Sequence, residues 1–122
     1  MNKQSKYKVK FNDAKSIMIH LLQEIEGYNY GTISLHKRVI RDLLSASKGR
    51  GAYLHIDKQS LLRWMIADAK GKSIHYAAIR FQVVYRYIEL LCKYQLLPDN
   101  PLREIKPRYG NPRWDDFITA LQ

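Results

Sequence analysis

Basic, hydroxyl and aromatic residues gather at two places in the 122-residue chain where the sequence predicts that an amphipathic helix begins. Lys and Arg neutralise phosphates, Arg can fork onto guanine edges, and hydroxyls or free backbone amides at a helix start hold phosphate oxygens. The two groups therefore predict a double-stranded DNA-binding surface, and the alternative for any single residue is a solvated basic face. The groups are Thr32, Ser34, His36, Lys37, Arg38 and Arg41, and Lys70, Lys72, Ser73, His75, Tyr76 and Arg80. Within them, the set expected to face a groove is His36, Arg38, Arg41, His75, Tyr76 and Arg80.

The charge balance of the chain supports a polyanionic partner. Twenty-one Lys and Arg against eleven Asp and Glu give a formal net charge of +10, and nucleic acid is the default partner for such an excess. The N-terminus has no hydrophobic leader, and no apolar run approaches the roughly 18 residues that span a bilayer. Cys92 is the only cysteine, so no disulfide framework exists. We expect a cytoplasmic, bacterial or phage-encoded protein without a membrane partner.

The residue types that usually carry catalysis or bind metals do not form a recognisable constellation. The four histidines and the single cysteine lie too far apart to give a close ligand pair. The chain also lacks a glycine-rich phosphate loop, a nucleophile elbow and a zinc-protease helix motif. The sequence therefore predicts no catalytic residue, no metal site and no cofactor.

The basic groups must be positioned by helices, because four segments carry apolar residues at helical spacing and none alternates for long enough to predict a strand. The first helix is expected after Asp13 as N-cap, and the second from Thr32 or Ser34 to about Ser47. A third follows Asp57, with Gly71 ending it. The fourth, from Ser73 to Leu96, would be about 36 Å long.

These helices divide the chain into three parts. Residues 1–12 form a basic arm that need not be ordered, because they hold four lysines and no acid. Residues 13–106 form the helical domain, which ends shortly after Pro98 and Pro101. Residues 107–122 are a linker or a short C-terminal helix containing Trp114, Phe117 and Leu121.

Four motifs, in order, resemble those of a known family. Thr32 and His36 stand where that family has the Thr and Tyr that open a DNA-contacting helix. Leu61-Leu62-Arg63-Trp64 is similar to its Leu-x-x-Trp pattern, and Ser73-Ile74-His75-Tyr76 stands where it often has Ser-Pro-Ala-Thr. The stretch from Leu96 to Lys106, with Asn100-Pro101 inside it, is similar to the end of the domain. The chain thus resembles the N-terminal core-binding domain of tyrosine recombinases, the phage integrases and their relatives.

This resemblance implies an all-α fold, a small orthogonal, SAM-like bundle of four main helices that forms half of a clamp around a core-type recombination site. Strand cleavage in the family belongs to a separate C-terminal domain, so the chain is not expected to be an enzyme by itself. Its partners would be double-stranded DNA, the catalytic domain of the same or a parent recombinase, and other recombinase protomers on DNA.

Several alternatives remain at this point. The chain is either a fragment of a longer integrase or a natural regulator without a catalytic domain. It could instead be a basic helical adaptor that binds another protein through Trp114, Phe117 and Leu121. RNA is a further candidate ligand for a basic helical surface.

Overall fold

The computed structural model describes residues 6–46 and 52–103, and four packed helices account for most of them. The predicted helical fold is thereby confirmed, and a two-stranded sheet is added to it. The predicted linker and the segment from Trp114 to Leu121 lie outside the described residues. In chain order the elements are β1 (Lys8–Lys10), α1 (Phe11–Glu24), α2 (Tyr30–Ala46), β2 (Tyr53–His55), α3 (Lys58–Asp68) and α4 (Ile74–Lys93).

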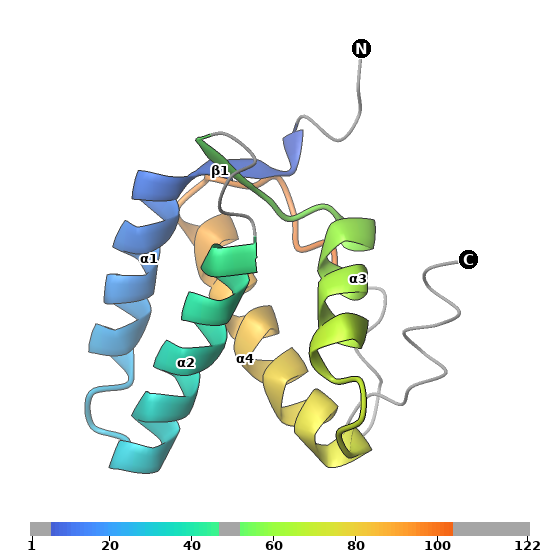
Figure 1. Cartoon of the computed structure of the whole chain (residues 1–122). Coiled ribbons are helices and arrows are strands. Elements are labelled where there is room, and N and C mark those ends of the chain that lie inside the picture. The colour runs from blue at the N-terminus through green and yellow to red at the C-terminus, as the bar shows by residue number, and fades with distance from the viewer. Residues whose placement is uncertain (1–5, 47–51, 104–122) are drawn as a thin grey trace.

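Helix α4 is the centre of the bundle, because it contacts each of the other three helices. The apolar residues that recur at helical spacing along it form a buried stripe, in which Phe81, Val84, Ile88 and Leu91 are all fully buried. Figure 1 shows α1 and α2 side by side, with α3 at the other side of the molecule. The turn between α1 and α2 and the turn between α3 and α4 lie at the same end of the bundle. The starts of α2 and α4, which carry the two predicted basic groups, therefore point to one end.

In the second half of the chain, the predictions of Asp57 as an N-cap and of a left-handed Gly71 are confirmed. Asp57 caps α3, since its carboxylate accepts a hydrogen bond from Ser60 N at 3.2 Å, and Ser73 caps α4 by accepting from Tyr76 N at 3.1 Å. Gly71 has the expected positive φ of 78°, a conformation that glycine adopts without strain. Helix α4 ends at Lys93 rather than Leu96, because Gln95 takes a φ of 62°.

The first two helices begin earlier than predicted. Helix α1 starts at Phe11, so Asp13 lies within its first turn instead of capping it; its negative charge there still favours the helix dipole. Helix α2 starts at Tyr30, and Asn29 accepts a hydrogen bond from Thr32 N at 2.8 Å. The side chain of Asn29, and not that of Thr32 or Ser34, therefore satisfies an amide at this start.

The sheet is the main element that the sequence interpretation missed, and it gives residues 8–10 of the basic arm a defined structure. Strands β1 and β2 pair antiparallel, with Val9 opposite Leu54. Both of these side chains are buried in the core. One further backbone hydrogen bond closes each end of the ladder, from Ile56 N to Tyr7 O and from Phe11 N to Ala52 O, both at 2.9 Å.

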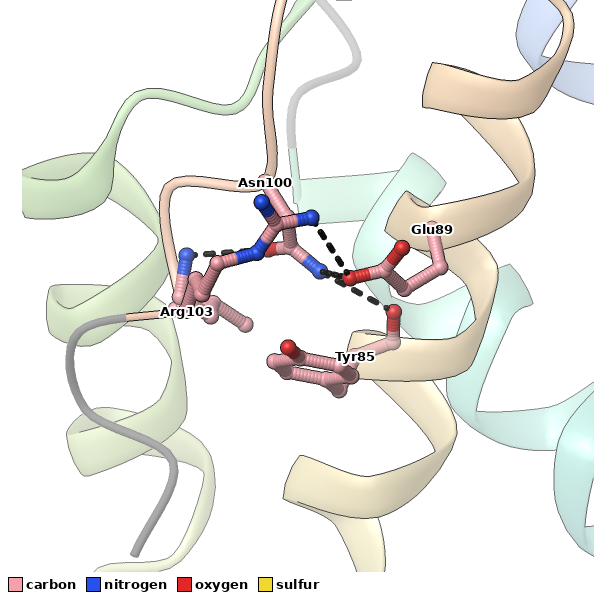
Figure 2. A network of polar contacts seen from close by, with 5 residues as sticks. Tyr85, Glu89, Asn100 and Arg103 are labelled. Carbon is pink, nitrogen blue, oxygen red and sulfur yellow. Dashed lines mark hydrogen bonds and ion pairs between the residues drawn. The ribbon is translucent and has the colours of Figure 1, made fainter.

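The chain leaves α4 through a turn that Asn100 fixes. Figure 2 shows Asn100 and Arg103 meeting the carboxylate of Glu89, at 3.2 and 3.4 Å respectively. Asn100 also donates to Tyr85 O at 3.4 Å and accepts from Leu102 N at 2.9 Å. Because Asn100 and Leu102 are buried, these bonds satisfy polar groups that water cannot reach.

Candidate nucleic-acid interface

The outer face of α2 carries a row of three exposed cations, Lys37, Arg38 and Arg41, which we call the α2 row. Their spacing of three and four residues places Arg41 one helical turn from the other two. Val39, Ile40 and Leu43 form the buried side of the same helix. The apolar pattern thus fixes the rotation of α2 and leaves the α2 row toward solvent. Thr32 and Ser34, one to two turns nearer the helix start, are only partly exposed.

A second exposed group, Lys70, Lys72 and His75, lies where α3 turns into α4, and we call its two lysines the turn cations. The reversal at Gly71 separates the two lysines, and the cap bond from Ser73 fixes the first turn of α4. Tyr76 is partly buried against the core, and its ring lies 5.7 Å from the Lys72 ammonium. Ser73 therefore caps the first turn of α4, and Tyr76 anchors this turn to the core.

Two of the predicted groove-facing residues are buried, and their predicted role does not fit that position. His36 is 7% exposed, and its Nδ1–H donates to Thr32 O at 2.8 Å within α2. Burial lowers the pKa of His36, which outweighs the opposing effect of this hydrogen bond, and the charge of Arg86 lowers the pKa further. The imidazole is therefore a neutral part of the helix packing near pH 7. Arg80 is 4% exposed.

Arg80 instead ties three helices together. From α4, its Nη2 donates to Asp42 on α2 at 2.7 Å and to Asp68 on α3 at 3.3 Å. Its Nε lies 2.5 Å from Asp68 Oδ2, a charge contact whose N–H direction falls outside hydrogen-bond geometry. The guanidinium also lies 5.2 Å from the Tyr76 ring and 5.9 Å from the Trp64 ring. We call this arrangement the Arg80 junction.

The Arg80 junction contains the two carboxylates that lie beside the exposed cations in the sequence. Asp42 follows Arg41 directly in α2, and Asp68 lies at the end of α3 just before Lys70. Both carboxylates pair with Arg80, whose single positive charge offsets one of their two negative charges. Among residues 6–46 and 52–103, the α2 row and Lys70 form no ion pair. The α2 row in the middle of α2 and Lys70 at the turn into α4 thus present exposed cations that can contact an anion.

Further exposed basic side chains lie outside the predicted groups. Lys10 on β1 and Arg63 on α3 are exposed, and Lys8 on β1 is partly exposed. The signal for the strand was present as Lys8-Val9-Lys10 and Tyr53-Leu54-His55, each with one apolar residue between two polar or amphipathic ones. Three residues are too few for a period of two to be distinguished from chance.

The described residues present exposed basic side chains at the surface. They contain no group of three or more His, Cys, Asp or Glu side chains that could hold a metal ion. No helix in this part of the chain is long and apolar enough to cross a bilayer. What the fold presents is a small four-helix domain with exposed cations in the middle of α2 and at the turn from α3 into α4.

Comparisons of the chain with protein-family models, with curated proteins and with solved structures find no match. Function must therefore be argued from this fold and this surface.

Proposed function

We propose that the chain binds double-stranded DNA through the α2 row and the turn cations. The observation that carries the proposal is the Arg80 junction, which occupies the two nearby carboxylates and joins the helices that bear both groups. Exposed Lys and Arg side chains without acidic partners bind phosphates and release counterions, which is the main source of affinity for DNA. The turn cations lie at the end of the bundle where α2 and α4 begin (Figure 1), and the α2 row lies about 10 to 17 Å along α2 from that end at 1.5 Å per residue, so both fall within the length of one turn of duplex.

The finer proposal is that the chain acts as the N-terminal core-binding domain of a tyrosine recombinase, at a core-type recombination site. Its support is the order of the sequence motifs together with the four-helix fold. Thr32 and Ser73, which belong to two of these motifs, lie at the starts of α2 and α4. The Asn100-Pro101 step, which belongs to a third, fixes the chain's exit from α4. In this proposal, cleavage belongs to a separate catalytic domain, and the present chain supplies DNA affinity and register.

The DNA-binding proposal is tested by measuring the fluorescence anisotropy of a labelled duplex with the native chain and two double variants. Arg38→Ala/Arg41→Ala removes two cations from the α2 row. Lys15→Ala/Lys93→Ala removes the same charge from exposed positions on α1 and at the end of α4. We expect the first variant to lose about tenfold or more in affinity at moderate salt, and the second to lose much less.

Equal losses for the two variants would contradict the assigned surface. Absence of duplex binding by the native chain at low salt would contradict the function itself and favour an adaptor that binds protein. The recombination-site proposal has its own test, which is selection of bound duplexes from a random pool. If the chain recognises a core-type recombination site, the selection enriches one sequence motif. If the selected pool stays random, only non-specific DNA binding is supported.

A further inference from the structure

The outer face of the two-stranded sheet carries basic and aromatic side chains and no acid. Residues directly opposite in an antiparallel pair share a face, so Lys8 lies with His55 and Lys10 with Tyr53. The opposite face consists of the buried pair Val9 and Leu54. The core therefore fixes which way the sheet faces and directs both lysines outward. We call Lys8, Lys10, Tyr53 and His55 the sheet face.

The lysines of the sheet face are partly ordered by aromatic contacts. The Lys8 ammonium lies 4.5 Å from the centre of the Tyr53 ring, a diagonal neighbour across the two strands. Lys6, just before β1, lies in the same way 5.2 Å from the ring of Tyr7. A cation over a ring keeps its charge while it loses part of its freedom. Binding an anion here then costs less ordering entropy than binding it with free lysine side chains.

Three acids flank the sheet face, and two of them accept hydrogen bonds from other groups. Asp57, just after β2, caps α3 through Ser60. Asp99 accepts a hydrogen bond from the Tyr7 hydroxyl at 2.9 Å, at the edge of the sheet near Lys6. Asp13 is exposed in the first turn of α1, where the helix dipole stabilises its charge. The strands themselves contribute only positive or neutral groups.

A depression connects the sheet face to the helices of the proposed DNA surface. His55 lines this depression together with Leu43 and Ala46 of α2 and with Ser60, Arg63 and Trp64 of α3. The Trp64 ring is also a contact of Arg80. The depression therefore runs from His55 of the sheet face to Trp64 beside the Arg80 junction. The exposed Arg63 borders it, and no acidic residue is among the residues that line it.

We infer that the sheet face is a second contact for the phosphate backbone of the same DNA duplex, an inference that rests on the DNA-binding function proposed above. In Figure 1, β1 lies at the end of the bundle opposite the turn between α3 and α4. The 17 residues of α2 span about 25 Å between these ends at 1.5 Å per residue. That separation is less than the roughly 34 Å of one turn of B-DNA. One duplex is long enough to meet both ends, with Lys8 and Lys10 holding phosphates at one of them.

The test measures duplex affinity by anisotropy over a series of salt concentrations for three versions of the full chain. Lys8→Ala/Lys10→Ala removes the two charges, Lys8→Arg/Lys10→Arg keeps them, and Arg38→Ala/Arg41→Ala serves as the reference for the helix surface. Circular dichroism of each variant establishes that it is folded. We expect the alanine pair on the sheet to weaken binding about tenfold at moderate salt and to reduce the salt slope by about two, and the arginine pair to retain native behaviour.

An unchanged affinity and slope for a folded Lys8→Ala/Lys10→Ala variant, with a loss for Arg38→Ala/Arg41→Ala, overturns the sheet contact and leaves the proposed function standing. An equal loss for the alanine and arginine pairs on the sheet also overturns it, because charge would then not be the cause. If the native chain does not bind duplex DNA at all, both proposals fail.

Discussion

Replacing Arg80 with alanine removes the side chain that joins α2, α3 and α4. The guanidinium is buried and pairs with Asp42 and Asp68, whose side chains are 49% and 19% exposed. After Arg80→Ala, water can solvate Asp42, which is half exposed. Asp68 would be left largely buried without its counter-charge, and the rings of Trp64 and Tyr76 would lose their cation.

The size of the effect follows from these exposures. Removing one partner of a fully buried ion pair costs about 3 to 5 kcal/mol, whereas an exposed pair contributes about 0 to 1 kcal/mol. Because one carboxylate is half solvated and the other mostly buried, we expect a loss of about 2 to 4 kcal/mol in unfolding free energy. For a domain of this size that corresponds to a fall in Tm of roughly 10 to 20 °C.

The assay is urea unfolding followed by circular dichroism, with Arg86→Ala as the matched control. Arg86 is on the same helix but exposed, and its guanidinium lies 5.6 Å from the ring of Tyr28. An exposed contact of this kind contributes about 0.5 to 1 kcal/mol. Arg80→Lys should fall between the two, since one ammonium cannot reproduce the planar fork of a guanidinium. If Arg80→Ala and Arg86→Ala shift the urea midpoint equally, the Arg80 junction does not hold the helices together.

Three further predictions concern single buried polar groups. Asn100→Ala should cost about 1 to 3 kcal/mol in urea unfolding, because it leaves the buried Leu102 N without its acceptor; a loss no greater than that of the exposed Asn12→Ala would refute this. Tyr87→Phe should cost about 0.5 to 1.5 kcal/mol by removing the 2.6 Å bond to Ala14 O. Burial raises the pKa of Tyr87, so above pH about 10 only the phenol of the unfolded state ionises. The unfolding free energy of the native chain should therefore fall more steeply with pH there than that of Tyr87→Phe. Equal slopes of unfolding free energy against pH would contradict the burial of this hydroxyl. Burial lowers the pKa of His36 below 6.5, so the unfolded state binds the proton first as the pH falls through that value. The unfolding free energy of the native chain should therefore decline more in this range than that of His36→Gln. Parallel pH profiles of the two proteins would argue against a buried neutral imidazole.

Helix positions were predictable from the sequence wherever spacing and capping agreed. The buried stripe of α4 follows from residues three and four apart, and the caps at Asp57 and Ser73 follow from residue type and position. The expected start of the second helix at Thr32 or Ser34 is too late, because Asn29 is the residue whose side chain caps α2 and Asn is common in turns as well as at caps. The end of α4 depends on the left-handed conformation of Gln95, which residue type does not indicate.

Charge alone could not separate exposed cations from buried ones. Arg80 and Arg41 have the same side chain, and each lies near a predicted helix start, yet Arg80 faces two acids that are distant in sequence. Asp42 is 38 residues away and Asp68 is 12 residues away, and only the packing of three helices brings them together. The pairing of Lys8 with His55 is likewise a long-range contact between short strands, which local patterns cannot reveal.

The central claim is that the α2 row and the turn cations act as one DNA surface. Its most direct test is the slope of duplex affinity against salt concentration for the native chain, Arg38→Ala/Arg41→Ala, Lys70→Ala/Lys72→Ala and the four-site combination. Each pair should reduce the slope by about two and the combination by about four. A native slope near zero, or a slope that neither pair changes, would contradict the claim.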